Sequence, residues 1–433
     1  MEVYALVMFA VAVLALLAGY PVAFTLGAVA MVFGFAFLGP SIFLALPLRI
    51  WGIMSNFTLL AVPLFVFMGV ILEKSGLAED LLESMGRALG GVRGGLAFST
   101  VLVGALLAAT TGVVGATVVT MGIIGLPTML KNGYAPSLAT GTIASAGTLG
   151  QIVPPSIILI LLGDVIGVPI GALFVAALVP SLVLVAMFLV YLGVTVAIRP
   201  DLAPPLARVA GSPGPARILR SIAPPLALIV AVLGSIFIGL ASPTESAAIG
   251  CVGALALAAA HRRLSLRMVA GAAQQTTRLT SMVFLILIGA TAFGLVFRGM
   301  GGDDLVEQAF LGLPGAQTSF IALSMLLVFG LGFFLDFIEI CFIVVPILAP
   351  IAERLDVDLL WFAVLLAANL QTSFLTPPFG FSLFYLKAVA PEGLRIEAIY
   401  RGILPFVALQ VMLLAILVAF PEVATWLPAR LAG

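Results

Sequence analysis

The feature that most constrains this chain is a succession of apolar stretches, each about as long as a bilayer's hydrocarbon core is thick. A helix needs about 20 such residues to cross some 30 Å of hydrocarbon. These stretches are residues 4–20, 21–39, 58–73, 95–113, 171–197, 221–240, 244–260, 280–298, 317–335 and 402–420. Only 9% of the residues are charged, whereas about a quarter are charged in soluble domains. We therefore predict an all-α polytopic membrane protein.

Four further apolar segments are interrupted by glycine, proline and polar residues. They cover residues 114–130, 138–167, 338–352 and 359–389. Because lipid cannot satisfy an open backbone, we expect short helices, broken helices or re-entrant hairpins that face protein or a polar cavity. Between residues 73 and 94, charged residues recur at helical spacing among leucines. That pattern predicts an amphipathic connecting helix at the membrane interface.

The arginine-rich loops indicate the orientation of the chain. They are residues 198–220 and 261–278, and two apolar stretches separate them. Both loops should therefore lie on one side, which the positive-inside rule makes cytoplasmic. Loop 198–220 is also rich in proline, alanine and glycine, as suits a linker between two halves. Residues 4–17 follow no basic signal-peptide region, so we expect a retained membrane helix there.

Charge and motifs exclude several classes of function. The chain has 19 basic and 19 acidic residues and a single histidine, so it offers neither a basic surface for nucleic acid nor a zinc site. It contains no G-x-x-x-x-G-K-[ST] loop, no G-x-S-x-G and no H-E-x-x-H. We therefore expect no enzyme and no cofactor, and any transport must be driven by an ion gradient or a partner.

The two halves of the chain carry prolines in matching positions. Pro127 pairs with Pro350, and Pro154-Pro155 pairs with Pro377-Pro378, because 350 − 127 and 377 − 154 both equal 223. Each Pro-Pro pair follows a small, polar segment in an otherwise apolar sequence. Three prolines in register predict an internal duplication.

A Pro-Pro break inside a membrane restricts what the segment can do. Proline removes a backbone donor and frees carbonyl groups in the preceding turn. Free carbonyls and nearby Ser/Thr hydroxyls suit a hard cation such as Na⁺, whereas the N-terminus of the helix that follows suits an anionic group. One such segment could therefore hold a sodium ion and an anionic substrate group together. The alternative is that Pro-Pro merely kinks packed helices.

Four carboxylates lie within or beside apolar stretches, where an ionised group is costly without a partner. Asp336 and Glu339 are three residues apart, so they share a face if helical, and they suit an ion path; a loop-edge position is the alternative. Asp164 follows Gly163 and favours a structural place near the interface. Glu245 follows Ser242 by three residues, which predicts a capping box at a helix start.

Several motifs together resemble the large membrane subunit of tripartite ATP-independent periplasmic (TRAP) transporters. They span essentially the whole chain and comprise Pro63–Gly69, Gly112–Thr117 with Pro127 and Gly133-Tyr134, Ala144–Ser156, Ser242–Glu245 and Leu375–Gly380. Within that family, 110–115 and 331–339 are most similar to the branch associated with mannitol, chloroaromatic acids and related monocarboxylates.

The resemblance implies an inverted-repeat, elevator-type sodium symporter of organic anions in the bacterial inner membrane. N-terminal scaffold helices and the connector helix would occupy 1–94, and further scaffold helices would occupy 221–316. The first repeat would be 95–197, with a re-entrant hairpin at about 138–167, and the linker 198–220 would follow it. The second repeat would be 317–433, with a hairpin at about 359–389 and a C-terminal helix. Such subunits work with a small four-helix membrane subunit and a periplasmic solute-binding protein, which we expect as separate polypeptides.

The resemblance also implies the site residues. Substrate would lie between the hairpins, near Ser145, Gln151, Pro154, Pro155, Asn369, Gln371, Pro377 and Pro378. Sodium sites would form from the hairpin tips and the unwound stretches 110–117 and 332–339, with candidates Thr110, Thr111, Gly112, Gly147, Thr148, Gly150, Asp336, Glu339, Thr372, Ser373 and Thr376. Many members carry Ser and Gly where this chain has Thr110, Thr111, Val113 and Val114, which favours backbone carbonyls over side chains as ligands there.

Two other interpretations remain open from the sequence. A stand-alone sodium-coupled carboxylate transporter of another elevator family would share the paired hairpins but need no binding protein. A channel or structural membrane protein would show no substrate-dependent sodium flux.

Overall fold

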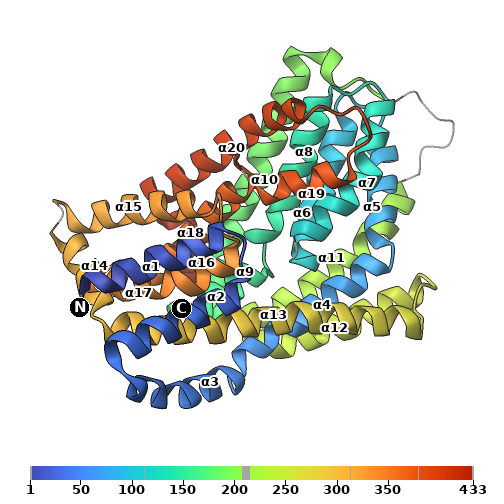
Figure 1. Cartoon of the computed structure of the whole chain (residues 1–433). Helices are drawn as coiled ribbons and strands as arrows, with labels where there is room; N and C mark the ends of the chain where they lie inside the picture. Colours follow the sequence, from blue (N-terminus) through green and yellow to red (C-terminus); the bar gives the residue numbers. More distant parts are fainter. Residues whose placement is uncertain (1, 113, 207–214, 313, 379, 432–433) are drawn as a thin grey trace.

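A computed structural model of the chain describes residues 2–112, 114–206, 215–312, 314–378 and 380–431. Helices joined by turns and loops make up those ranges, without strands, as the apolar stretches predict (Figure 1). By length and composition, five of the described helices could cross a membrane, or six if the bent pair Pro40–Met54 and Thr58–Lys74 forms one span. Each of the ten predicted stretches contains a helix.

The helices outside the repeat are long and packed on one another. They are α1 (Glu2–Leu17), α2 (Val22–Phe33), α3 (Leu46–Met54), α4 (Ala61–Lys74), α11 (Pro215–Phe237), α12 (Pro243–Ala260) and α13 (Leu266–Gly299). α13 packs along α2 and α4, and α4 also packs along α12. The chain ends in α21 (Glu422–Leu431), which packs on α10.

The offset of 223 residues relates helix to helix across the two halves. The first copy is α5 (Leu77–Leu89), α6 (Gly95–Thr111), α7 (Val114–Lys131), α8 (Pro136–Thr148), α9 (Ile157–Ile166) and α10 (Ile170–Ile198). The second is α14 (Gly302–Leu311), α15 (Ala316–Leu331), α16 (Phe337–Ile343) with α17 (Val345–Arg354), α18 (Leu359–Leu375), α19 (Phe381–Val389) and α20 (Ile396–Ala419). The duplication read from three prolines thus extends over six structural units.

The two copies run in opposite directions across the bundle. α13 has 34 residues, so its ends lie about 50 Å apart. The guanidinium of Arg263, just before α13, lies beside Gly76 at the start of α5. At the other end of α13, Arg298 pairs with Asp303 of α14. The first helices of the two copies therefore lie at opposite ends of the molecule (Figure 1).

The two arginine-rich loops lie at the same end, as the sequence predicts. Arg263 adjoins the start of α5, and the backbone N–H of Leu206 donates to Gly90 O, just after α5, at 2.7 Å. We call this the basic end. Residues 207–214 of the expected linker lie outside the described residues. The expected loop 261–278 is mostly wrong, because Ser265 caps α13 through the N–H of Met268 and the helix begins at Leu266.

Several interrupted segments differ from their predicted form. Residues 114–130 form one helix, α7, despite Pro127; a single proline removes only one hydrogen bond, and neighbouring turns hold the helix. The stretches expected to be unwound, 110–117 and 332–339, are narrower in the structure, since α7 begins at Val114 and α16 at Phe337. The amphipathic connector is confirmed as α5, whose apolar face packs on α6, α7 and α11.

Both predicted hairpins are pairs of helices broken at Pro-Pro. In the first, α8 continues into a short 3-10 turn, Leu149–Gln151, and α9 starts after Ser156. In the second, α18 ends at Leu375 and α19 starts after Gly380. The peptide bond between the two prolines is cis in each copy. The first tip is buried, whereas Pro378 of the second tip is exposed.

α8 and α20 cross in direct backbone contact. A Cβ on Gly141 would lie 2.1 Å from Gly402 O, and one on Gly402 would lie 2.1 Å from Ser137 O. No side chain fits at that spacing, so the crossing requires glycine at both positions. It holds the first arm of hairpin one against the last long helix of the second copy.

Candidate functional site

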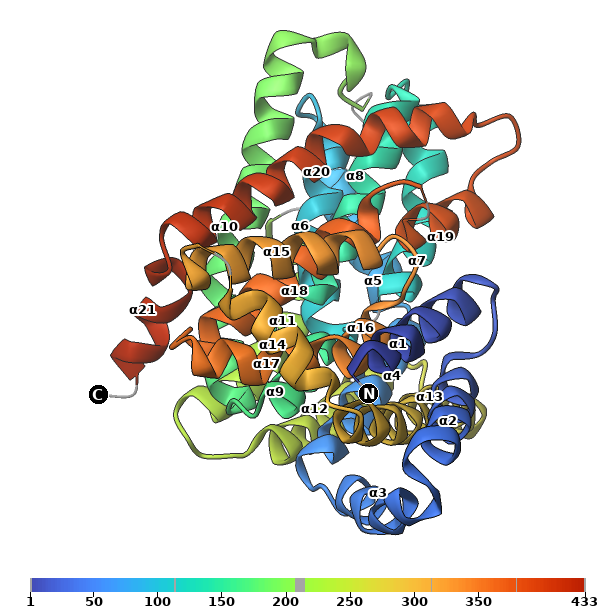
Figure 2. The same cartoon turned by 60° about the vertical axis from the view of Figure 1, so that its left-hand side comes forward.

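The hairpins interlock across the two copies. α19, the second arm of hairpin two, packs on α7 and α8 of the first copy, and Ser382 Oγ donates to Ala144 O at 3.1 Å. α9, the second arm of hairpin one, packs on α16, α17 and α18 of the second copy. The predicted site segments therefore meet in the centre of the molecule (Figure 2).

Thr148 lies where the two copies meet. Its hydroxyl accepts from Gln371 Nε2 at 3.4 Å and from Gln410 Nε2 at 3.3 Å, and donates to Ser145 O at 2.8 Å. Thr148 and Gln371 are 223 residues apart, so they are counterparts in the repeat. Two equivalent positions in contact lie close to the axis that relates the copies. The central polar cluster, as we call it, consists of Thr148 with Ser145, Gln371 and Gln410, to which it is hydrogen-bonded.

The central polar cluster is buried and short of hydrogen-bond partners. Among the described residues, Ser145 Oγ and the amide oxygens of Gln371 and Gln410 have no protein partner. The same holds for Ser324 Oγ on α15, for both side-chain polar atoms of Gln151 in hairpin one and for the amide oxygen of Asn369 on α18. Leaving such an atom unsatisfied costs about 1–3 kcal/mol. Native proteins leave few buried polar atoms without a partner, so the cluster has the character of a place that binds something polar. Neutral oxygens are ligands that suit a hard cation.

Other predicted ligands are bonded locally. The hydroxyls of Thr110, Thr372, Ser373 and Thr376 each donate to a carbonyl three or four residues earlier in their own helix. Their lone pairs remain free to accept or coordinate. Gly150 is buried in the short 3-10 turn of hairpin one. The side chain of Thr111 lies outside the described residues.

Two of the predicted glycines have packing reasons for being glycine. Gly112 ends α6 with φ +59°, a left-handed conformation that favours glycine, and lies against Ile157 at the start of α9. A Cβ on Gly147 would lie 2.2 Å from Val118 Cγ2, so α7 and α8 approach closely there. Both glycines bring the helix break of the first copy next to hairpin one.

Asp336 and Glu339 form a capping box at the start of α16. The N–H of Phe337 donates to Asp336 Oδ1 at 2.7 Å, and the N–H of Asp336 donates to Glu339 Oε2 at 3.1 Å. Phe337 contacts Phe374 near the end of α18, with ring centroids 6.3 Å apart. The two carboxylates thus stand beside hairpin two with a local structural role. The capping box predicted for Ser242 and Glu245 is confirmed.

The substrate candidates divide between the two tips. Pro154 and Pro155 are buried, and Ser156 Oγ closes the first tip by donating to Gln151 O at 2.8 Å. Pro377 is half-buried. Asn369 Nδ2 donates to Met325 O at 2.6 Å, which links hairpin two to α15. Within the described residues, no three His, Cys, Asp or Glu side chains gather to hold a metal ion.

Two buried polar residues, Ser324 and Gln410, were not predicted, and Gln410 belongs to the central polar cluster. Ser324 and Gln410 lie in α15 and α20, inside the apolar stretches 317–335 and 402–420. A lone polar residue at mid-membrane is itself a signal of function. That signal is present in the sequence, but the partner of Gln410 is Thr148, 262 residues away.

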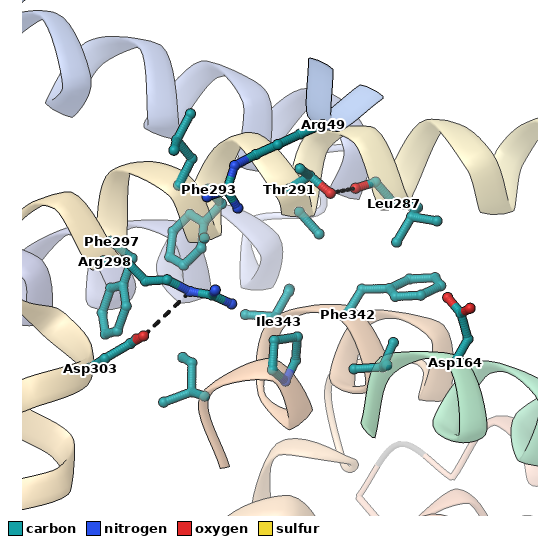
Figure 3. A pocket seen from close by; sticks show the side chains of 16 residues that line it. Arg49, Asp164, Leu287, Thr291, Phe293, Phe297, Arg298, Asp303, Phe342 and Ile343 are labelled. Atoms are coloured by element: carbon teal, nitrogen blue, oxygen red, sulfur yellow. Dashed lines mark hydrogen bonds and ion pairs between the residues drawn. The ribbon is translucent and has the colours of Figure 1, made fainter. Parts of the chain in front are cut away.

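A charged cavity lies beside the last turns of α13, toward the end opposite the basic end. Its volume is about 210 Å³, and its lining comes from α3, α9, α13, α14, α16 and α17. The side chains of Arg49 and Arg298 are directed into it, with Phe293 and Phe297 on the α13 side (Figure 3). Asp164 lies at its far edge, where Oδ1 accepts from Asn56 Nδ2 at 2.7 Å.

Comparison with known proteins decides the family. Residues 7–423 match the family model described as "Tripartite ATP-independent periplasmic transporter, DctM component". The chain belongs to this family. It is therefore a large permease subunit of a TRAP transporter, an inner-membrane protein and not an enzyme, and the resemblance seen in the sequence is confirmed.

Curated relatives match over most of their length. The ectoine/5-hydroxyectoine TRAP transporter large permease protein of Ruegeria pomeroyi is 31% identical, over 86% of both chains. The C4-dicarboxylate large permease protein of Pseudomonas aeruginosa is 29% identical, over 89% of both chains. The sialic acid large permease protein of Vibrio cholerae is 29% identical, over 96% of this chain and 97% of that one.

A solved structure supports the fold. The chain is similar to the Alcanivorax borkumensis YdaH transporter, with a TM-score of 0.65 and 14% identity over 96% of this chain and 98% of that one. The YdaH transporter is described as having an unusual topology. At this identity the likeness concerns the fold alone.

Proposed function

We propose that this TRAP permease subunit imports an organic anion, of the monocarboxylate class or a related acid, by sodium symport with an elevator movement. The observation that carries the proposal is the central polar cluster. Its unpartnered oxygens, at the contact between counterpart residues Thr148 and Gln371, supply ligands for a hard cation. Sodium is here a co-substrate that is bound and released.

The helix ends beside the cluster support an anionic substrate. α9 and α19 begin directly after the two Pro-Pro breaks, and the first N–H groups of a helix attract anions. Dicarboxylates and sialic acid, named for the relatives, carry carboxylate groups, and so does ectoine. The shared feature is an acidic group, which is what the helix N-termini would bind.

The inverted arrangement supports an elevator movement. In such transporters one group of hairpins moves against a fixed scaffold around a central site. Here the central polar cluster lies on the interlocked hairpins and α20, and α13 with α2 and α4 forms a layer that packs beside them. The charged cavity lies between that layer and α9, α16 and α17, where the two groups would slide.

The partners proposed are a small four-helix membrane subunit and a periplasmic solute-binding protein. The match covers only 60% of the sialic acid TRAP transporter permease protein of Haemophilus influenzae and 58% of the isethionate permease protein of Oleidesulfovibrio alaskensis. Those relatives carry additional chain in the same polypeptide. We propose that this chain works with a partner that corresponds to that additional part.

Asp336→Asn tests whether the capping box also serves the ion path. Asparagine caps helices about as well as aspartate, so thermal stability should hold, whereas loss of the negative charge should lower the apparent sodium affinity about tenfold. Uptake measured against sodium concentration in proteoliposomes gives the result. Ser242→Ala, at the other capping box, is the control. An unchanged sodium dependence would leave Asp336 purely structural.

Arg49→Gln tests the charged cavity as part of the anion's route. The side chain of Arg49 is directed into the cavity (Figure 3), so its loss should raise the KM for the anion about fivefold at low salt. Added salt should shrink the difference by screening. Arg49→Lys should retain most of the affinity, and Arg87→Gln at the basic end should have no effect. A KM that does not change would exclude the cavity from the route.

A further inference from the structure

A second basic pocket lies at the basic end, far from Arg49 and Arg298. Its volume is about 460 Å³. It is formed by the last turns of α10, the first turn of α8 and the first turns of α20. Tyr191, Thr195 and Arg199 come from the α10 side, Ser137 from α8 and Arg401 from α20. We call it the α10–α20 pocket.

The charge in the α10–α20 pocket is positive and not neutralised by the protein. Arg199 and Arg401 are both exposed, and neither takes part in the ion pairs found among the described residues. The nearest acidic residues along the chain are Asp201 and Glu397, and no ion pair joins either to these arginines in the described ranges. Two guanidinium groups therefore remain available for an anion.

Two further features favour an anion at this place. α8 begins at Pro136 with no side-chain cap, so the N–H groups of its first turn lack a capping acceptor. Ser137 and Thr195 add hydroxyl groups to the lining, and Tyr191 adds a phenol. Arginine guanidinium groups bind phosphate oxygens in a two-pronged geometry.

An apolar track leads from the pocket along the outside of α10. Val190, Val194 and Ile198 are spaced four residues apart and are 64%, 52% and 73% exposed. Residues four apart share a helix face, so the three side chains form one stripe, and Val194 and Ile198 also line the pocket. A stripe of this kind on a membrane helix faces lipid acyl chains.

We propose that the α10–α20 pocket binds the headgroup of an anionic phospholipid, with an acyl chain along Val190, Val194 and Ile198. The basic end is the cytoplasmic end by its arginine content, and basic pockets between helices at that surface suit anionic headgroups. The apolar track distinguishes a lipid from a free phosphate. Gly402 also lines the pocket, at the place where α8 and α20 touch backbone to backbone.

Native mass spectrometry of the purified chain tests this binding. Phosphatidylglycerol, phosphatidylcholine and glycerol 3-phosphate are titrated separately onto delipidated protein. Phosphatidylglycerol should bind at least tenfold more tightly than phosphatidylcholine. Arg199→Gln and Arg401→Gln should each weaken it about fivefold, and the double variant about 25-fold. Glycerol 3-phosphate alone should bind at least 100-fold more weakly than the lipid.

Matched variants separate the pocket from general charge. Arg267→Gln removes an exposed arginine at the same end, outside the pocket, and should not change the affinity. The double variant Arg199→Lys with Arg401→Lys keeps the positive charge and should retain most of the affinity for phosphatidylglycerol. That result would also show that the chain is folded. Ile198→Asn should weaken the lipid without affecting glycerol 3-phosphate. Equal affinity for both lipids, or an unchanged affinity in the double glutamine variant, would overturn the proposal.

Discussion

Replacing Gln371 with leucine is expected to reduce substrate uptake 10- to 100-fold without reducing thermal stability. Among the described residues, the only protein partner of its side chain is Thr148, at 3.4 Å, and its amide oxygen is buried without one. Removing a buried polar group that the protein leaves unsatisfied is neutral or stabilising. Losing the contact between an amide oxygen and a bound cation should cost about as much as losing a hydrogen bond to a charged group, about 1.5–3 kcal/mol, which corresponds to the expected fall in uptake.

The control for Gln371→Leu is Gln274→Leu, at an exposed position of α13. It makes the same chemical change away from the central polar cluster and should leave uptake normal. Thermal melts in detergent and uptake into proteoliposomes are measured on both proteins. Normal uptake by Gln371→Leu, combined with a lower melting temperature, would mean that the cluster only holds the hairpins together.

Gly141→Ala is expected to destabilise the protein by about 3 kcal/mol. The added Cβ would lie 2.1 Å from the backbone oxygen of Gly402, so α8 and α20 would have to move apart. That movement would also displace Thr148 from Gln410. A fall of several degrees in melting temperature is the expected measurement.

Gly193→Ala provides the matched control, since a Cβ on Gly193 meets nothing within 4 Å. Alanine there should stabilise α10 by up to about 1 kcal/mol. A third variant, Gly402→Ala, should behave like Gly141→Ala because both residues belong to one crossing. If Gly141→Ala melted at the same temperature as Gly193→Ala, the close approach of α8 and α20 would be contradicted.

The architecture could be predicted because in a bilayer the local sequence decides most of it. Apolar length specified the helices, and the offset between Pro127 and Pro350 specified the repeat. The predicted loop 261–278 was wrong where two local signals competed, arginine content and helix capping. Arg267 and Arg278 suggested a loop, yet Ser265 caps a helix that contains both.

The site could be predicted only in part because its members meet through tertiary packing. The hairpin residues Ser145 and Gln371 could be found because each lies in the polar segment before a Pro-Pro pair, which both copies share. The position of Gln410 follows from the crossing at Gly141 and Gly402, which no local pattern contains. The capping role of Asp336 was readable in principle from Glu339 three residues later, but the apolar setting of both residues pointed first to ions.

The central claim is that the paired hairpins form the site of a sodium symporter that needs a binding protein. Uptake by a reconstituted transporter tests this claim most directly. Radiolabelled 2-oxo or aromatic monocarboxylates would be offered to proteoliposomes containing this chain and its small partner subunit. A sodium gradient and the cognate binding protein would be supplied together, singly or not at all. We predict uptake only when both are present. Sodium-driven uptake without a binding protein would contradict the tripartite mechanism and favour a stand-alone transporter, and uptake that ignores sodium would contradict the symport.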